Sequence, residues 1–349
     1  MTLRARVMLT LGTLQLDVEL VVSDAVVAVV GPNGAGKTTV LRALAGLVPI
    51  DGGRIAIDGR VVDDPAAGIR LPPQDRHVGV VFQEHRLFPN LTALENVAFG
   101  LRARGTPRAE ARRQAAHWLE RVGLPEVAHL RPRALSGGQA QRVALARALA
   151  TEPAVVLLDE PLAAVDTAAR AELRRLLRGE LRRYPGARVI VTHDPVEAAA
   201  LADEIVVLEG GRITQHGPLA EVTARPRSAW VATMVGLNLL AGTADGTTVA
   251  LPSGQTLVSP TPSTGAVFAA FRPNAVTLHR HRPEGSARNT WPGHATELYP
   301  AGDRARVRVD GPVPLVAEVT ASAVAELHLA DGGPIWVSLK ATEIDVYPA

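Results

Sequence analysis

The stretch Gly31-Pro32-Asn33-Gly34-Ala35-Gly36-Lys37-Thr38 decides the fold, because it has the spacing of a phosphate-binding loop. Apolar residues 26–30 precede it, and a helical pattern with Val40, Leu41 and Leu44 on one face follows it. Glycines let backbone N–H groups approach phosphate oxygens, and the start of a helix adds partial positive charge. We expect residues 31–39, including Thr39, to bind a nucleotide, with Lys37 reaching its β- and γ-phosphates and Thr38 offering a hydroxyl to Mg²⁺.

Lysine is nearly absent from the rest of the chain. Of 37 basic residues, two are lysines, Lys37 and Lys340, and all others are arginines. A lysine is a compact point charge on a thin stem, whereas arginine is a broad planar fork. The bias alone can be chance, but it draws attention to the surroundings of both lysines.

Composition is that of a folded protein with about two domains. Hydrophobic residues make up 47% of the 349 residues and charged residues 21%, and there is no cysteine, which excludes disulfides and thiolate metal sites. The net charge of +2 without a long basic run gives little support to nucleic-acid binding. Residues 229–244 are too short and polar for a membrane span, and residues 1–6 lead into no signal-peptide core. The sequence therefore favours the cytosol.

A change in residue composition and periodicity along the chain predicts two domains. In residues 1–235 strands alternate with helices, which predicts an α/β domain with a mostly parallel sheet covered on both faces. Residues 84–150, charged and alanine-rich between Pro107 and Leu130, are expected to form an inserted helical subdomain. Glycine, proline and short alternating runs predict a small OB-like β-barrel, or two small β units, over residues 239–349.

A pair of carboxylates follows the apolar run 155–158. Asp159, at the end of a buried strand, is expected to bind Mg²⁺ through water, and Glu160 to polarise the attacking water. Strand-end acids that merely face solvent are common. The phosphate loop upstream favours the catalytic interpretation.

Several further motifs, in a fixed order, resemble those of the ABC ATPase family. Leu135-Ser136-Gly137-Gly138-Gln139 is similar to the family signature, and a helix is expected over residues 140–150. The resemblance implies that Gln83 and His193 act in catalysis beside Glu160, with Gln83 also at the metal. Asp166 corresponds to the family's D-loop, although Ala163 stands where serine is usual. The implied nucleotide-binding residues are those of the loop together with Ser136, Gly137, Gly138, Gln139 and Asp166.

The family implies partners as well as chemistry. It implies a head-to-tail homodimer with two ATP molecules and Mg²⁺ between the subunits, each ATP meeting the loop of one chain and the Ser136 turn of the other. With one nucleotide domain and no membrane segment, the chain would serve integral membrane permease subunits, peripherally on the cytoplasmic face. The permease would in turn receive an external anion-binding protein. Phe88 and Leu91 are expected to contact the permease, with ordinary core packing as the equal alternative.

One departure concerns the base. Family members commonly stack adenine on an early aromatic residue, but no aromatic residue precedes Phe82. Leu14, Leu16 or Arg4 would then cover the base without ring stacking. We therefore expect weak discrimination between ATP and GTP.

The C-terminal region narrows the substrate. Ser286-Ala-Arg288-Asn289 and Ser338-Leu-Lys340-Ala-Thr342 resemble the hallmarks of the Mop-type molybdate-binding barrel, part of the TOBE group, over residues 285–347. Their donors suit a tetrahedral dianion, so Ser286, Arg288, Asn289, Ser338 and Lys340 form a candidate oxyanion site. The alternative is that they only hold the barrel together.

An importer of molybdate is the expectation that follows. Import of sulfate or thiosulfate is the main alternative, because both anions are tetrahedral dianions and donor type does not distinguish them. A soluble ABC ATPase outside a transporter is disfavoured, since such proteins commonly carry two nucleotide domains or a long coiled coil.

Overall fold

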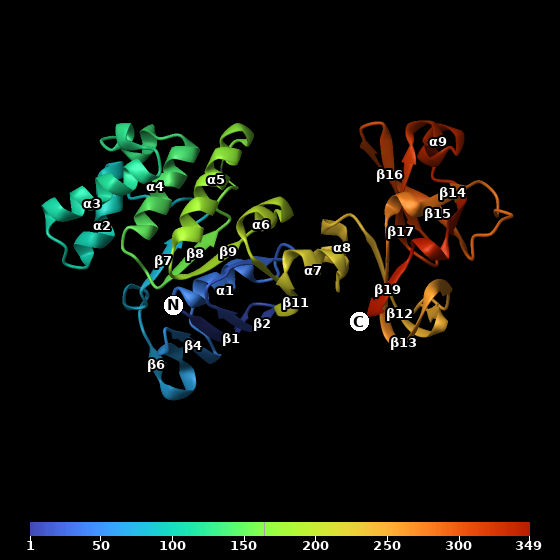
Figure 1. Ribbon diagram of the computed structural model, residues 1–349, viewed down its shortest axis with the longest axis horizontal. Helices are drawn as coiled ribbons and strands as arrows, with labels where there is room; N and C mark the ends of the chain where they lie inside the picture. Colours follow the sequence, from blue (N-terminus) through green and yellow to red (C-terminus); the bar gives the residue numbers. More distant parts are fainter. Residues whose placement is uncertain (164) are drawn as a thin grey trace. The chain divides into compact units, whose positions relative to one another are not determined.

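The computed structural model describes residues 1–163 and 165–349 and contains two compact units, Met1–Leu219 and Ala220–Ala349 (Figure 1). The first unit therefore ends earlier than the predicted domain boundary near residue 235. The reason is that α8 (Ala229–Met234) packs on β12 (Asn238–Ala250), and the Tyr347 hydroxyl donates to the Pro226 carbonyl, 2.7 Å away. The connecting segment thus belongs to the second unit.

The first unit is built on an 11-stranded sheet in the order β6-β5-β4-β1-β2-β11-β10-β3-β9-β8-β7. The strands are β1 (Leu3–Leu11), β2 (Leu14–Val22), β3 (Val26–Val30), β4 (Gly52–Ile57), β5 (Arg60–Asp64), β6 (Ile69–Arg70), β7 (Val78–Val81), β8 (Val155–Asp159), β9 (Ala187–Val191), β10 (Glu204–Glu209) and β11 (Arg212–Pro218).

This sheet is mixed, and the prediction of a mostly parallel sheet was wrong for its first half. Strands β10, β3, β9, β8 and β7 run parallel, and β3 and β8 are buried along their whole length. Strands β1, β2, β4, β5 and β6 are antiparallel. Alternation of buried and exposed residues in β1 and β2 allows this half to keep one face in solvent.

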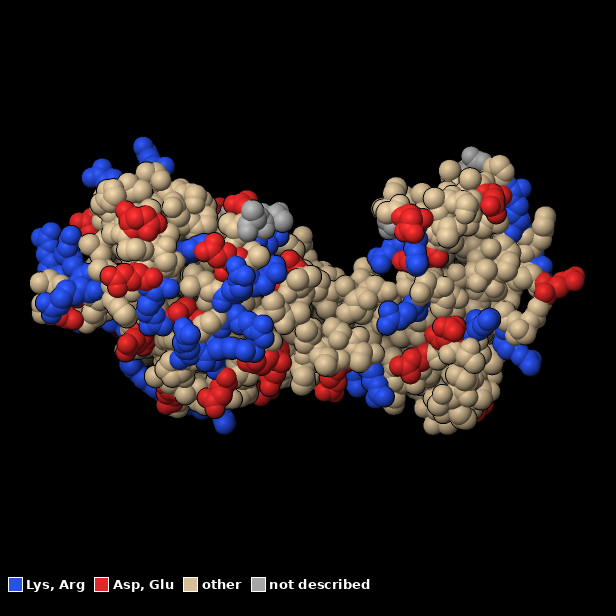
Figure 2. Space-filling model, turned by 45° about the horizontal axis from the view of Figure 1, so that its top comes forward, with Lys and Arg blue, Asp and Glu red and all other residues tan. Residues whose placement is uncertain are grey.

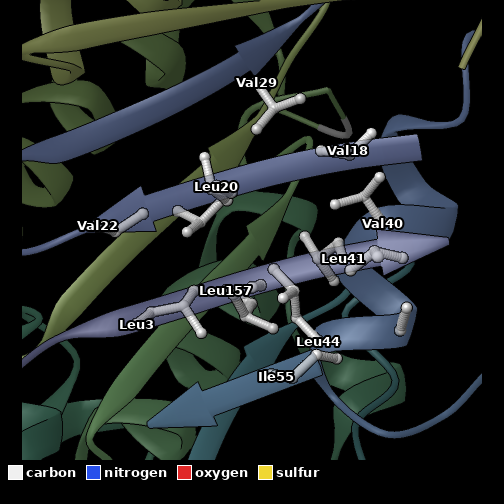
Figure 3. Packing of buried hydrophobic residues seen from close by; sticks show 14 of the residues in the cluster. Leu3, Val18, Leu20, Val22, Val29, Val40, Leu41, Leu44, Ile55 and Leu157 are labelled. Carbon is white, nitrogen blue, oxygen red and sulfur yellow. The ribbon is translucent and has the colours of Figure 1, made fainter. Parts of the chain in front are cut away.

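The core lies between this sheet and α1 (Lys37–Leu44). Val40, Leu41 and Leu44 of α1 face the strands, as the helical pattern predicts, beside Leu3 of β1 and Ile55 of β4 (Figure 3). Packing α1 on the sheet fixes the loop that joins it to β3.

Helices cover the rest of the first unit. The segment expected to form a helical subdomain contains α2 (Ala93–Ala103), α3 (Arg108–Arg121) and α4 (Gly137–Leu149), which share a hydrophobic cluster that runs from Ala93 to Ala150. The remaining helices are α5 (Thr167–Arg183) and α6 (Pro195–Leu201), followed by α7 (Leu219–Ala224) at the junction of the two units.

The second unit is an antiparallel β structure with one shared core. A three-stranded sheet, β12-β13-β19, accompanies a five-stranded sheet, β14-β18-β15-β16-β17, whose edge strands β14 and β17 contact each other and nearly close a small barrel. This confirms the predicted small barrel. Its remaining elements are β13 (Thr256–Phe271), β14 (Val276–His279), β15 (Asn289–Ala301), β16 (Arg304–Asp310), β17 (Leu315–Thr320), α9 (Ala321–Glu326), β18 (Pro334–Leu339) and β19 (Asp345–Pro348).

Charge is mixed on the surface. Blue and red side chains are interspersed on the face shown in Figure 2. Among the residues that the structure describes, no helix is long and apolar enough to cross a membrane.

Candidate functional site

The phosphate loop connects β3 to α1, and its backbone requires glycine. Gly31 and Gly36 have φ of 152° and 101°. A Cβ on Gly31 would lie 2.0 Å from the Leu208 carbonyl oxygen, and one on Gly36 would lie 2.6 Å from Leu16 Cδ2. A side chain at position 31 would therefore displace the loop from the sheet, whereas one at position 36 would strain the left-handed backbone and push the end of Leu16 aside.

Lys37 is folded back on this loop. Its Nζ donates to the carbonyl oxygens of Gly31, at 2.8 Å, and Pro32, at 2.9 Å, and the residue is 7% exposed. Burial lowers the pKa of Lys37 below its ordinary value, while the charges of Glu160 and Asp159 oppose that shift. A buried cation that donates to two carbonyls at the open start of a helix suits a phosphate.

Thr38 and Asp159 meet beside the lysine. The Thr38 hydroxyl donates to Asp159 Oδ1 at 3.1 Å, and Asp159 is 4% exposed at the end of β8. Burial raises the pKa of Asp159, while the bond from Thr38 and the cations Arg42 and Lys37 act in the opposite direction. Hydroxyl and carboxylate oxygens are the hard donors that Mg²⁺ takes in phosphate sites, so this pair fits the metal that the sequence implies.

Glu160 contacts both of the other candidate catalytic residues. Gln83 Nε2 donates to its Oε2 at 3.2 Å, and His193 Nδ1 lies 3.0 Å from its Oε1. The Glu160 backbone has φ of 45°, uncommon for a residue with a side chain, and its N–H donates to Val191 at 2.9 Å. The ends of β7, β8 and β9 thus bring together three residues that are far apart in the sequence.

The Ser136 turn lies at the start of α4. Ser136 caps this helix, since its Oγ accepts from the Gln139 N–H at 3.3 Å while Gln139 Oε1 accepts from the Ser136 N–H at 3.0 Å. The helix therefore begins at Gly137, three residues before its predicted start. Ser136 and Gly137 are exposed, so this amide-rich end is open to an incoming anion.

Asp166 is the N-cap of α5 in its own chain. It caps α5 by accepting from the Ala169 N–H at 3.0 Å, and its side chain is otherwise exposed. Gly138 lies near Val165 and Ala169, so the Ser136 turn and the Asp166 loop are neighbours within one chain. The Ser136 turn makes its described contacts with α4 and α5 and not with the phosphate loop.

The structure reduces the number of residues that could contact adenine. Leu14 and Leu16, on β2, lie against Gly36. Arg4 stands opposite Val21, at the other end of the β1–β2 hairpin. The two leucines are therefore the candidates that reach the nucleotide loop.

The candidate oxyanion residues divide into two groups. Asn289 is 1% exposed and bonds to both the N–H of Val258, at 2.6 Å, and its carbonyl, at 3.0 Å. The hydroxyl of Ser338, 7% exposed, lies 2.8 Å from His279 Nε2. Ser286, Arg288 and Lys340 are exposed. Asn289 and Ser338 thus hold strands together, which was the alternative expectation for the whole set, and the other three are exposed to a ligand.

The fold and the arrangement of its polar residues define a P-loop ATPase domain joined to a small β-barrel unit. Family models match at two places, one for ABC transporters over residues 16–163 and one for the TOBE domain over residues 285–346. The structure of a dimeric post-hydrolysis state of the ATP-binding cassette MJ0796 bound to ADP and Pi matches with a TM-score of 0.53 and 31% identity, over 63% of this chain and 99% of that one.

Full-length relatives come from import systems. The molybdenum import ATP-binding protein ModC of Mycobacterium tuberculosis (strain ATCC 25618 / H37Rv) is 43% identical over 96% of this chain and 95% of its own length. The sulfate/thiosulfate import ATP-binding protein CysA 2 of Chromobacterium violaceum is 40% identical over 92% of this chain and 87% of its own. The chain belongs to the family of ABC transporter ATP-binding proteins.

Proposed function

We propose that this chain is the ATP-hydrolysing subunit of an importer for an oxyanion, molybdate above others. The observation that carries the ATPase part is Glu160 held between Gln83 and His193 beside the Thr38–Asp159 pair. Molybdate is favoured because the molybdenum import protein is the more similar of these two relatives, at 43% identity over 96% of this chain. Sulfate import remains the second candidate, since a sulfate/thiosulfate import protein is 40% identical.

Each residue has a separate task in this proposal. Lys37 and the amides of the loop bind the β- and γ-phosphates, and Thr38, Asp159 and Gln83 hold Mg²⁺. When bound, Mg²⁺ supplies positive charge that stabilises the transferring phosphoryl group. Glu160 accepts a proton from the attacking water, and His193 orients Glu160 and contacts the γ-phosphate.

A homodimer completes the site. The open start of α4 at Ser136 makes its described contacts away from the phosphate loop of its own chain. A second copy placed head to tail would bring its Ser136, Gly138 and Asp166 to the γ-phosphate. Nucleotide then joins the two subunits, and hydrolysis releases them. The dimeric MJ0796 cassette supports this arrangement.

Glu160→Gln tests the ATPase assignment. Without a general base the variant should bind ATP normally and hydrolyse it about 10²- to 10⁴-fold more slowly, trapping a dimer. Steady-state ATPase assays and size-exclusion chromatography with ATP measure both effects. Glu126→Gln, which alters an exposed glutamate in a distant turn, is the matched control. A wild-type rate in Glu160→Gln would remove Glu160 from the mechanism.

A groove of about 980 Å³ in the first unit is the proposed site for the permease. It contains Phe88 and Phe99, whose ring centroids are 4.4 Å apart and which are 37% and 46% exposed. Leu91 is only half-buried and does not line the groove. Of the two predicted contact residues, Phe88 therefore has the better support.

Arginines give this groove its charge. Arg147 donates to the carbonyls of His85 and Arg86, at 3.0 and 2.8 Å, and Arg104 donates to that of Thr151. Within the described part of the chain, neither arginine forms an ion pair. A permease segment with an apolar anchor and a carboxylate would fit. Phe99→Asp should abolish co-purification with the permease while the isolated subunit keeps its ATPase rate; retained co-purification would place the permease elsewhere.

Partners and location go with this proposal. The chain would lie on the cytoplasmic face of the membrane, bound to its permease, which receives the external anion-binding protein. Exposed Ser286, Arg288 and Lys340 in the barrel unit would bind molybdate, either as a feedback signal or to stabilise the dimer. Titrating molybdate against the ATPase activity of the assembled transporter separates these two uses, because only feedback predicts inhibition.

A further inference from the structure

Two residues close to His193 in the sequence have buried polar side chains. Thr192 is 1% exposed and Glu197 is 4% exposed. Glu197 belongs to α6, which starts two residues after His193. Neither residue touches the phosphate loop in the described contacts, and nothing in the ATPase mechanism above uses them. Burying a carboxylate without a cation in an ion pair is costly, so its place calls for an explanation.

The hydrogen bonds of Thr192 have a defined direction. The Asp194 N–H donates to Thr192 Oγ1 at 3.1 Å, so Oγ1 is an acceptor there. Its own hydrogen is then free for Glu197 Oε2, 2.8 Å away. The Thr192 N–H donates to the Val29 carbonyl at 3.3 Å. His193 therefore lies between two residues whose backbones are fixed, one by the central strand β3 and the other by a hydroxyl that Glu197 orients.

The same carboxylate lies near the arginines of α5, the helix that Asp166 caps. Burial raises the pKa of Glu197, and Asp194 adds to that shift, while the bond from Thr192 and the cations Arg170 and Arg174 of α5 oppose it. Arg170 also donates to the Val165 carbonyl at 3.2 Å, next to Asp166. Glu197 thus bonds to Thr192 on one side and interacts electrostatically with the arginines of α5 on the other.

We propose that Glu197 is a positioning residue for ATP hydrolysis, acting through Thr192 to hold His193 against Glu160. The inference rests on the ATPase function proposed above. It predicts that loosening this link lowers turnover and leaves ATP binding intact, because Thr192 and Glu197 do not line the phosphate loop.

Thr192→Val is the primary test, because valine keeps the shape and removes the hydroxyl. We expect kcat to fall about tenfold, since small displacements of catalytic groups are costly, with KM for ATP within about twofold of wild type. Thr192→Ser, which keeps the hydroxyl, should restore at least about half of the lost kcat. Glu197→Gln keeps an acceptor oxygen and should lose less than Glu197→Leu. If Thr192→Val does not fold, Thr192→Ala has the same expected outcome.

A His193→Ala background distinguishes positioning from general stability. If Thr192 acts through His193, Thr192→Val should cause no further loss of kcat in that background. Equal loss in both backgrounds, or a kcat unchanged by Thr192→Val, would overturn the inference. Absence of ATPase activity in the wild-type protein would instead overturn the proposed function, so the two failures are distinguishable.

Discussion

The two units contain similar polar motifs at strand ends but use them differently. In the first unit, Thr38, Asp159 and Glu160 bond to other residues of the same site, and their contacts leave donors and acceptors for nucleotide and metal. In the second unit, Asn289 uses both ends of its amide on the backbone of Val258, and the Ser338 hydroxyl bonds to His279. A motif can therefore mark a binding site or a structural joint, and what its side chains bond to distinguishes the two: other residues of the same site in the first unit, and neighbouring strands in the second.

Asp159→Asn should give the largest effect, a loss of ATPase activity without a loss of stability. Losing the metal carboxylate should lower ATPase activity at least about 10²-fold, because charge on the phosphoryl group is no longer neutralised. The folded protein should be no less stable. Burial raises the pKa of Asp159, so its stabilising contribution is present at low pH and is lost as pH rises through that raised pKa.

Thermal and denaturant unfolding at neutral pH, compared between Asp159→Asn and wild type, measure the change in the free energy of unfolding. Marked destabilisation would mean that ionised Asp159 holds the fold together, and the contrast with the second unit would fail.

Asn289→Ala should show the opposite behaviour. Two buried backbone bonds are lost and the Val258 groups are left unpaired, so the free energy of unfolding of the second unit should fall by about 2 kcal/mol. Denaturant melts monitored by tryptophan fluorescence measure it, since Trp291 is buried in this unit. Arg288→Ala, at the exposed neighbouring position, is the control and should leave stability unchanged. If Asn289→Ala is as stable as wild type, Asn289 is not a structural residue and is again a candidate for binding the oxyanion.

Lys340→Gln tests whether the exposed group binds an anion. We expect about a tenfold loss of molybdate affinity by isothermal titration calorimetry, because one charge-assisted bond is removed, and no change in stability. Equal affinity in wild type and variant would leave the second unit a scaffold only.

Discrimination between bases is the smallest expected effect. The polar residues proposed to bind nucleotide serve its phosphates and metal, and the leucines beside Gly36 offer no specific bond to adenine. The ratio of kcat/KM for GTP to that for ATP should stay above about one-tenth, a difference below about 1.4 kcal/mol. A much lower ratio would reveal a base-specific contact.

Individual strands and helices could be predicted from the sequence, but the pairing of distant strands could not. Strand β3 and the helix face of Val40, Leu41 and Leu44 follow directly from apolar spacing. The antiparallel half of the sheet was missed, because alternation in β1 and β2 shows a strand with one solvent face but not the direction of its partner. The early end of the first unit depends on tertiary contacts such as that between Tyr347 and Pro226.

The candidate site shows the same limit. Motif order located Gln83, Glu160 and His193, and the strand ends account for their meeting. Glu197 was not singled out, because a glutamate near the start of a helix usually faces solvent. Its burial depends on how α6 packs beside α5.

The scarcity of lysine gives the protein a built-in chemical reporter. An amine-reactive acylating reagent can modify the N-terminus, Lys37 and Lys340. Lys340 is open to solvent, whereas Lys37 is 7% exposed and donates to two carbonyls of its own loop, so the two amines should be acylated at different rates. Peptide mass spectrometry over a time course of acylation would then report nucleotide binding from the change at Lys37 and anion binding from the change at Lys340, in a single sample.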